Sequence, residues 1–255
     1  MRLADFWQNC QRDLKLFSFL LLCFCLARAY FIGYMSSYMG PTVDSGEIAL
    51  AMWTGLRLSL KSAGALALPP FVFGTLVALL CPGWQRMSEN LRRWWGALSL
   101  LFLAVCFQAR FPYYRQFRST FDMHVLMGWQ DDRAALFSTM LAEYGLVWRL
   151  MLAVLLAGAA YLALRRWLAR PVFPWPLAGN LRRWQQGLVS LTLAAGIFLF
   201  MLFVRFGGSF NYERGVSFLS AAVTGDDFLN ECILDDVQAL YRVKSFADNM
   251  AAGKI

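Results

Sequence analysis

The chain has 255 residues, of which 59% are hydrophobic and only 16% are charged. A soluble domain carries about a quarter charged residues, so this composition excludes an ordinary soluble protein and predicts a polytopic membrane protein. The net charge of +8 would suit nucleic acid, but the basic residues gather beside apolar runs, and we expect no nucleic-acid partner.

Five apolar runs are long enough to cross a bilayer. They lie at Leu16–Tyr34, Ser62–Leu80, Trp94–Ala109, Leu146–Leu164 and Leu188–Val204. The sequence therefore predicts an all-α membrane protein, with a five-span domain over 1–204 and an extracytoplasmic helical tail over 205–255. Within the tail, we expect one helix from Asp226 or Asp227 to about Tyr241.

The first run leaves two questions open. A basic start, an apolar stretch Leu16–Leu26 and an Ala27-Arg28-Ala29 box also fit a cleaved signal peptide. Apolar residues continue to Tyr34, which favours an uncleaved helix. Arg28 inside the run predicts either a structural ion pair or a substrate contact. Its candidate partners are the acidic residues Asp122, Asp131, Asp132 and Glu143.

Between the first two runs, Met35–Lys61 predicts a short amphipathic helix at the membrane interface. Asp44 and Glu47 have the spacing of a capping box at its start. In the second run, Pro69 and Pro70 should kink the helix. In the fourth run, three alanines make a small face for helix packing, namely Ala153, Ala157 and Ala160.

The basic residues predict the orientation. With the N-terminus inside, the loops that follow the second and fourth runs are also inside, and these regions contain only three acidic residues, Asp5, Asp13 and Glu89. Their basic residues are Arg2, Arg12, Lys15, Arg86, Arg92, Arg93, Arg165, Arg166, Arg170, Arg182 and Arg183. By the positive-inside rule, the N-terminus is cytoplasmic and the C-terminal tail lies outside.

The stretch from Arg110 to Arg149, here called the insert, is too charged to cross a bilayer and lies between the third and fourth runs. It contains the only histidine, His124, which we interpret as an interfacial polar residue. Asp131 or Asp132 can cap a helix with two apolar rows, Leu136–Met140 and Phe137–Leu141–Tyr144. This helix either lies on the outer leaflet or covers a lipid head-group site.

Seven residues are candidates for binding a phospholipid head group: Arg57, Arg110, Tyr113, Tyr114, Arg115, Arg118 and Glu143. Guanidinium groups bind phosphate in a bidentate manner, and tyrosine prefers the depth of the membrane interface. The alternative is that the arginines only anchor the chain to anionic lipid.

The sequence shows no GxSxG, HExxH, P-loop or dinucleotide motif, and its six cysteines form no CxxC pair. We therefore expect no catalytic residue, cofactor or metal in this chain. A transporter is disfavoured because no pair of broken helices indicates an inverted repeat.

Three stretches resemble the membrane portion of the lipoteichoic acid synthase family, the sulfatase-fold phosphoglycerol and phosphoethanolamine transferases of the bacterial envelope. The first stretch is Gly55-Leu56-Arg57-Leu58-Ser59-Leu60, although the family commonly has an aspartate where this chain has Leu58-Ser59. The second joins Tyr113-Tyr114, Asp131-Asp132, Thr139-Met140 and Glu143-Tyr144-Gly145. The third joins Phe228-Leu229-Asn230 and Val237-Gln238-Ala239-Leu240.

The resemblance implies a multi-pass protein of the bacterial cytoplasmic membrane that anchors a transferase and presents its lipid substrate. The family's sulfatase-type catalytic domain, with its Mn or Mg ion, is expected where this chain reaches Lys254-Ile255, and no residue here matches it. A separately encoded catalytic domain is thus an expected partner, beside membrane phospholipid. The alternative is a non-enzymatic scaffold or lipid-binding protein in envelope polysaccharide assembly.

Overall fold

The computed structural model describes residues 2–130, 133–174 and 182–253, which form α-helices and short 3-10 or π turns without a strand. The long helices are α1 (Arg2–Tyr34), α2 (Ser45–Pro69), α4 (Gln85–Phe117), α7 (Leu146–Ala169) and α8 (Arg183–Arg205). The shorter α-helices are α3 (Val77–Leu80), α5 (Met123–Gln130), α6 (Arg133–Ala142), α9 (Asp227–Ile233) and α10 (Asp236–Ala251). The remaining short elements are the 3-10 turns η1 (Ser36–Tyr38), η3 (Pro82–Trp84) and η4 (Phe218–Ser220), and the π-helical segment η2 (Pro70–Leu76).

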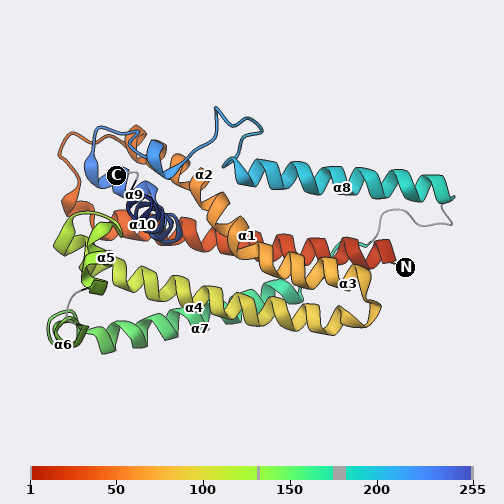
Figure 1. Cartoon of the computed structure of the whole chain (residues 1–255), viewed down its shortest axis with the longest axis horizontal. Helices are drawn as coiled ribbons and strands as arrows, with labels where there is room; N and C mark the ends of the chain where they lie inside the picture. Colours follow the sequence, from red (N-terminus) through yellow and green to blue (C-terminus); the bar gives the residue numbers. More distant parts are fainter. Residues whose placement is uncertain (1, 131–132, 175–181, 254–255) are drawn as a thin grey trace.

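Five helical segments are long and apolar enough to cross a membrane, which confirms the predicted all-α, five-span class. They are α1, α2 continued through η2 and α3, α4, α7 and α8. All five run along the long axis of the molecule (Figure 1). We call the end that carries α5, α6 and α9 the insert end, and the end where α1 begins the N-terminal end.

The predicted interfacial helix over Met35–Lys61 is not a separate element. Helix α2 begins at Ser45, where Asp44 accepts a hydrogen bond from the Glu47 backbone N–H at 2.8 Å, which confirms the cap at Asp44. The Glu47 carboxylate does not complete the predicted box and accepts instead from the Gly225 backbone N–H at 3.0 Å. The helix then continues into the second apolar run without a break. At Pro69 and Pro70, where a kink is predicted, the helix widens into the π turn η2, which accommodates prolines that cannot donate a backbone N–H.

Helix α4 is also longer than the apolar run that predicted it. It includes the basic stretch before that run and the first part of the insert, as far as Phe117. Helix α7 packs along α4 through the predicted small face, where Ala153 and Ala157 are buried. Gly96 of α4 permits this approach, because a Cβ there would lie 2.6 Å from Leu164.

Near the N-terminal end, α1, η2 and α4 meet at a buried ion pair. Arg92 donates to Asp13 at 2.5 Å and to Thr75 Oγ1 at 2.6 Å, and Thr75 also donates to Asp13. Arg92 is only 1% exposed. A charged pair this deep is tolerated because each charge has both an opposite charge and a hydroxyl partner.

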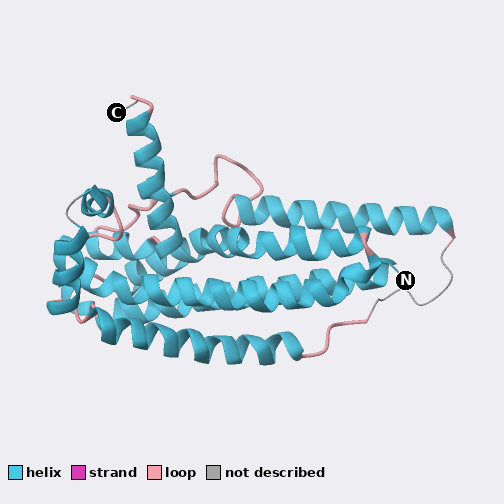
Figure 2. Cartoon of the chain, turned by 60° about the horizontal axis from the view of Figure 1, so that its bottom comes forward, coloured by secondary structure: helices cyan, strands magenta, loops and turns pink. Residues whose placement is uncertain are grey.

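Helix α8 lies at one edge of the bundle, on the side away from α4 and α7 (Figure 1). It packs mainly on α2, and only 6% of its apolar window is buried, compared with 39% for α1. The tail returns to the insert end, where α9 lies on α2 and α10 leaves the bundle at a steep angle (Figure 2). The single helix expected in the tail is two helices, because Asp235 caps a new one.

Candidate functional site

The tail packs into the core at the insert end. Phe228 and Ile233 of α9 are buried with Phe31 of α1, and with Phe111 and Tyr114 of α4. The Phe228 ring lies 6.1 Å from that of Phe31 and 5.5 Å from that of Tyr114. The boundary predicted at 204/205 therefore does not separate the tail from the hydrophobic core.

Arg28 of α1 holds the end of α9. Its Nε donates to the carbonyl of Cys232 at 3.0 Å, and its Nη2 donates to the carbonyl of Ile233 at 3.1 Å and to Ser59 Oγ at 2.7 Å. Arg28 is 2% exposed. The Arg28 contacts are structural, and none of them involves the carboxylates predicted as partners, although Asp131 and Asp132 lie outside the described residues.

Arg110 of α4 makes the second attachment of the tail. It pairs with Asp236 of α10 at 3.4 Å, donates to the Glu231 carbonyl at 3.2 Å, and lies 4.3 Å from the centre of the Phe31 ring. Arg110 is 4% exposed. The predicted head-group residue Arg110 is therefore buried between the tail and Phe31 of α1.

The loop after α4 makes the third attachment. Glu231 Oε2 accepts from the backbone N–H and the hydroxyl of Thr120, at 2.7 and 2.5 Å. Arg242 of α10 donates to the Thr120 hydroxyl at 2.9 Å and pairs with Glu231 at 3.5 Å. The insert and the tail are thus fixed to each other as well as to the bundle.

Tyr113 is part of a local network around Asp122. The Tyr113 hydroxyl donates to Asp122 Oδ1 at 2.5 Å, and Ser119 donates to Oδ2 at 2.7 Å. His124 Nδ1 lies 2.8 Å from Oδ1, and its ring stacks on Phe117. Burial raises the pKa of Asp122, but the hydrogen bonds outweigh it and hold that pKa below its usual value. The charged Asp122 carboxylate therefore accepts these hydrogen bonds and fixes the loop after α4.

Arg115 and Arg118 are the predicted arginines that stay exposed near the head of the insert. Arg115 Nη2 lies 3.4 Å from the hydroxyl of Tyr34, and the Arg118 guanidinium lies 4.1 Å from the centre of the Tyr38 ring. Arg118 ends α4 in the left-handed region, with φ of 57°, which is uncommon for a residue other than glycine. We call these four residues the Arg–Tyr patch.

The other predicted candidates lie elsewhere. Tyr114 is 3% exposed and belongs to the aromatic core. Arg57 donates to the carbonyls of Gly207 and Arg214 at 2.8 and 2.6 Å, so it holds the chain that leaves α8. Glu143 is exposed after α6. The structure thus leaves Arg115 and Arg118 exposed at the end of α4 and uses Arg57, Arg110 and Tyr114 for packing and attachment.

The insert helix predicted from two apolar rows is α6, whose Phe137 and Leu141 are 56% and 41% exposed. The capping residues proposed for it, Asp131 and Asp132, lie outside the described residues. An exposed apolar face at one end of a bundle suits contact with lipid acyl chains or with a partner. Nearby, Arg149 donates to the carbonyl of Tyr144 at 2.9 Å and is half-buried.

A scan against protein-family models, a search of curated proteins and a search of solved structures each found no match to this chain. The chemistry of the site therefore rests on its own residues. Within residues 2–130, 133–174 and 182–253, no group of three or more His, Cys, Asp or Glu side chains is placed to hold a metal ion. The Arg–Tyr patch offers cationic and aromatic groups, which suit an anion with an apolar body.

Sequence reasoning missed the attachment of the tail through Arg28, Ser59 and Asp235. Ser59 and Ser62 lie one helical turn apart in an apolar run, which indicates a polar face on α2. That spacing could have identified the face. It could not have identified the partner, because Asp235 lies 176 residues beyond Ser59.

Proposed function

We propose that this chain is the membrane-anchoring, lipid-presenting portion of a phosphoglycerol-type transferase for envelope glycopolymer synthesis in a bacterial cytoplasmic membrane, with its N-terminus inside. The observation that carries the proposal is the Arg–Tyr patch, two exposed guanidinium groups beside two tyrosines at the end of the bundle where the tail is fixed. The resemblance of three stretches to that transferase family supports the same reading, and the basic loops support the orientation.

In this proposal, Arg115 and Arg118 bind the phosphodiester of an outer-leaflet phospholipid, because planar guanidinium groups match phosphate oxygens. Tyr34 and Tyr38 limit how the two arginines move. The tail, fixed through Arg28 and Arg110, keeps a catalytic domain joined to it or bound to it close to the same leaflet. That domain supplies the nucleophile and the divalent metal.

Lipid binding tests the patch directly. We expect the double variant Arg115→Ala/Arg118→Ala to bind phosphatidylglycerol about 25-fold more weakly in native mass spectrometry, from about fivefold per arginine at a membrane surface. The matched control is Arg86→Ala/Arg93→Ala, which removes two exposed arginines at the N-terminal end. Equal binding by the double variant and this control would exclude the patch as a head-group site.

The transferase role needs a second experiment. The chain and a sulfatase-type catalytic domain are reconstituted in phosphatidylglycerol vesicles, and release of diacylglycerol is measured. We expect release only when both are present, and less release with Arg115→Ala/Arg118→Ala. A domain that works equally well without the chain would favour the scaffold function instead. Release of diacylglycerol by the chain alone would contradict the expectation that this chain has no catalytic residue.

A further inference from the structure

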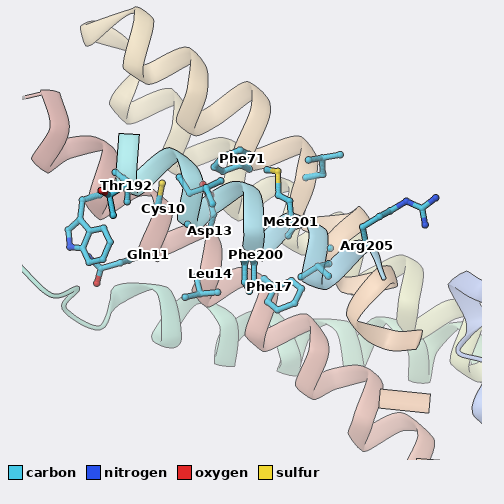
Figure 3. Close-up of a pocket in the computed structure, with 18 of the residues that line it drawn as sticks. Cys10, Gln11, Asp13, Leu14, Phe17, Phe71, Thr192, Phe200, Met201 and Arg205 are labelled. Atoms are coloured by element: carbon cyan, nitrogen blue, oxygen red, sulfur yellow. The ribbon is translucent and has the colours of Figure 1, made fainter. Parts of the chain in front are cut away.

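A crevice of about 1000 Å³ lies between α8 and the α1–α2 pair. Its walls are almost entirely apolar and include Leu68 and Ile197. Figure 3 shows Phe17, Phe71 and Phe200 among the side chains that line it. It is remote from the Arg–Tyr patch, since neither Arg115, Arg118, Tyr34 nor Tyr38 lines it. Its volume is at the upper end of the range for small-molecule sites, about 300–1000 Å³.

Helix α8 approaches the bundle closely near its own C-terminal end. There, a Cβ on Gly64 of α2 would lie 2.4 Å from Val204, and the rings of Phe17 and Phe200 are 5.4 Å apart. Arg57 fixes the same end by donating to the Gly207 carbonyl. Further along α8, a Cβ on Gly196 would meet no atom within 4 Å, although Gly196 lines the crevice.

The two ends of the crevice differ in charge. At the C-terminal end of α8 it is lined by Lys61 and Arg205, and its only acidic lining residue, Asp13, lies on the N-terminal part of α1, where it is paired with Arg92. Lys61 donates to the carbonyl of Val216. The Arg205 side chain has no hydrogen bond or ion pair with any described residue, and its guanidinium extends away from the other labelled side chains (Figure 3). An anion at this end would therefore meet two positive charges.

The size and the charge together identify the occupant. A 20-residue helix about 30 Å long and 10 Å wide fills roughly 2400 Å³, more than twice the space available. Acyl chains can adapt to a smaller and irregular crevice. We propose that this crevice binds one anionic phospholipid. Its acyl chains lie between α8 and the α1–α2 pair, and its phosphate lies beside Arg205 and Lys61.

This lipid site goes beyond the proposed function and does not rest on it. A lipid here fills the space under α8, the span that has least protein contact, and so ties that helix to the bundle. The lipid presented to a catalytic domain would bind at the Arg–Tyr patch instead. Variants of Gly196 and of Arg115 therefore separate the two proposals.

The test fills the crevice from within. The substitution Gly196→Leu adds a side chain in open space and improves helix propensity, so the chain should fold as before. We expect it to weaken about tenfold the binding of one palmitoyl-oleoyl phosphatidylglycerol molecule, counted by mass in native mass spectrometry, because added bulk in an occupied site is costly. A lipid bound at the Arg–Tyr patch should be unaffected. The control is Gly158→Leu on α7, which also meets no atom within 4 Å and does not line the crevice. It should bind as the wild type does.

The charge of the head group is tested with Arg205→Glu and with phosphatidylcholine. We expect Arg205→Glu to weaken phosphatidylglycerol binding at least about fivefold and to leave phosphatidylcholine binding unchanged. Unchanged phosphatidylglycerol binding in Gly196→Leu would overturn the site. Loss in Gly196→Leu but not in Arg205→Glu would overturn the anionic assignment. A lipid-free dimer that Gly196→Leu converts to a monomer would show that a second copy covers this face, and would also overturn the proposal.

Discussion

Arg28 and Asp235 are joined through a single hydroxyl, that of Ser59. Arg28 Nη2 donates to Ser59 Oγ at 2.7 Å, and Ser59 Oγ donates to Asp235 Oδ2 at 3.0 Å. Arg28 also caps the last carbonyls of α9, while Asp235 accepts from the Gln238 N–H at the start of α10. The positive charge of Arg28 thus lies at the C-terminal end of α9, and the negative charge of Asp235 lies at the N-terminal end of α10. Each charge complements the helix dipole at that end. The junction of α9 and α10 is held against α1 and α2 as a consequence.

Cys232 should report whether the tail is attached. Its side chain is completely buried, and burial raises the pKa of its thiol to about 12. In a variant that keeps Cys232 as its only cysteine, we expect very slow reaction with a maleimide at pH 8, since the thiolate is the reactive form. Arg28→Ala should accelerate labelling more than about tenfold, because it removes the hydrogen bonds to the Cys232 and Ile233 carbonyls, and a hydrogen bond to a charged group contributes about 1.5–3 kcal/mol. Equal labelling rates would contradict the attachment.

Gly55 should be required for the position of Arg28. A Cβ on Gly55 would lie 2.4 Å from Arg28 Nε, so the guanidinium could not keep its hydrogen bonds. We expect Gly55→Ala to lower the free energy of unfolding in detergent by about 1–3 kcal/mol. Gly158→Ala is the control, because no atom lies within 4 Å of its Cβ. That control should be neutral or up to about 1 kcal/mol more stable, and a similar gain in Gly55→Ala would contradict the prediction.

The sequence predicted the parts of the fold that depend on local patterns. The five apolar runs predicted the five membrane-spanning helices, and the Asp44–Glu47 spacing predicted where α2 begins. It did not predict that α4 continues to Phe117, because charged residues ended the apolar run while the backbone stayed helical. Helix α4 can carry those residues because Arg110 and Tyr114 are buried against the tail.

The candidate site was less predictable than the fold. From residue type alone, Arg110 was predicted to bind a head group together with Arg115 and Arg118. In the structure Arg110 is buried, and the other two are exposed. The difference arises from Asp236, which lies 126 residues after Arg110. Periodicity identifies the face on which a side chain lies, but it does not identify a distant partner that covers the face.

Asp236 should make the stability of the fold depend on pH. Burial raises its pKa to about 6, against the attraction of Arg110. Because the folded state binds this proton more tightly than the unfolded state, ionisation between about pH 4 and 6 costs stability. Relative to Asp236→Asn, the wild type should therefore gain stability as the pH falls from 7 to 4. Thermal unfolding in detergent at pH 7, 6, 5 and 4 measures this difference, and parallel profiles would contradict it.

The orientation predicted from the basic loops can be tested with two cysteines at opposite ends of the bundle. Cys81 is exposed where α3 meets η3, toward the N-terminal end, and Ser138 is exposed on α6, at the insert end. The two variants keep either Cys81 alone or Ser138→Cys alone. In intact cells, a membrane-impermeant maleimide should label Ser138→Cys and leave Cys81 unlabelled, because the positive-inside rule places the N-terminal end in the cytoplasm.

Permeabilised cells provide the control for this experiment. Once the membrane is open, Cys81 should react as well, which shows that its lack of reaction in intact cells comes from sidedness and not from burial. Labelling of Cys81 alone in intact cells would reverse the orientation. It would also place Arg115 and Arg118 on the cytoplasmic leaflet, where an extracytoplasmic transferase could not use a lipid bound to them. The orientation thus decides whether the Arg–Tyr patch can serve the proposed function.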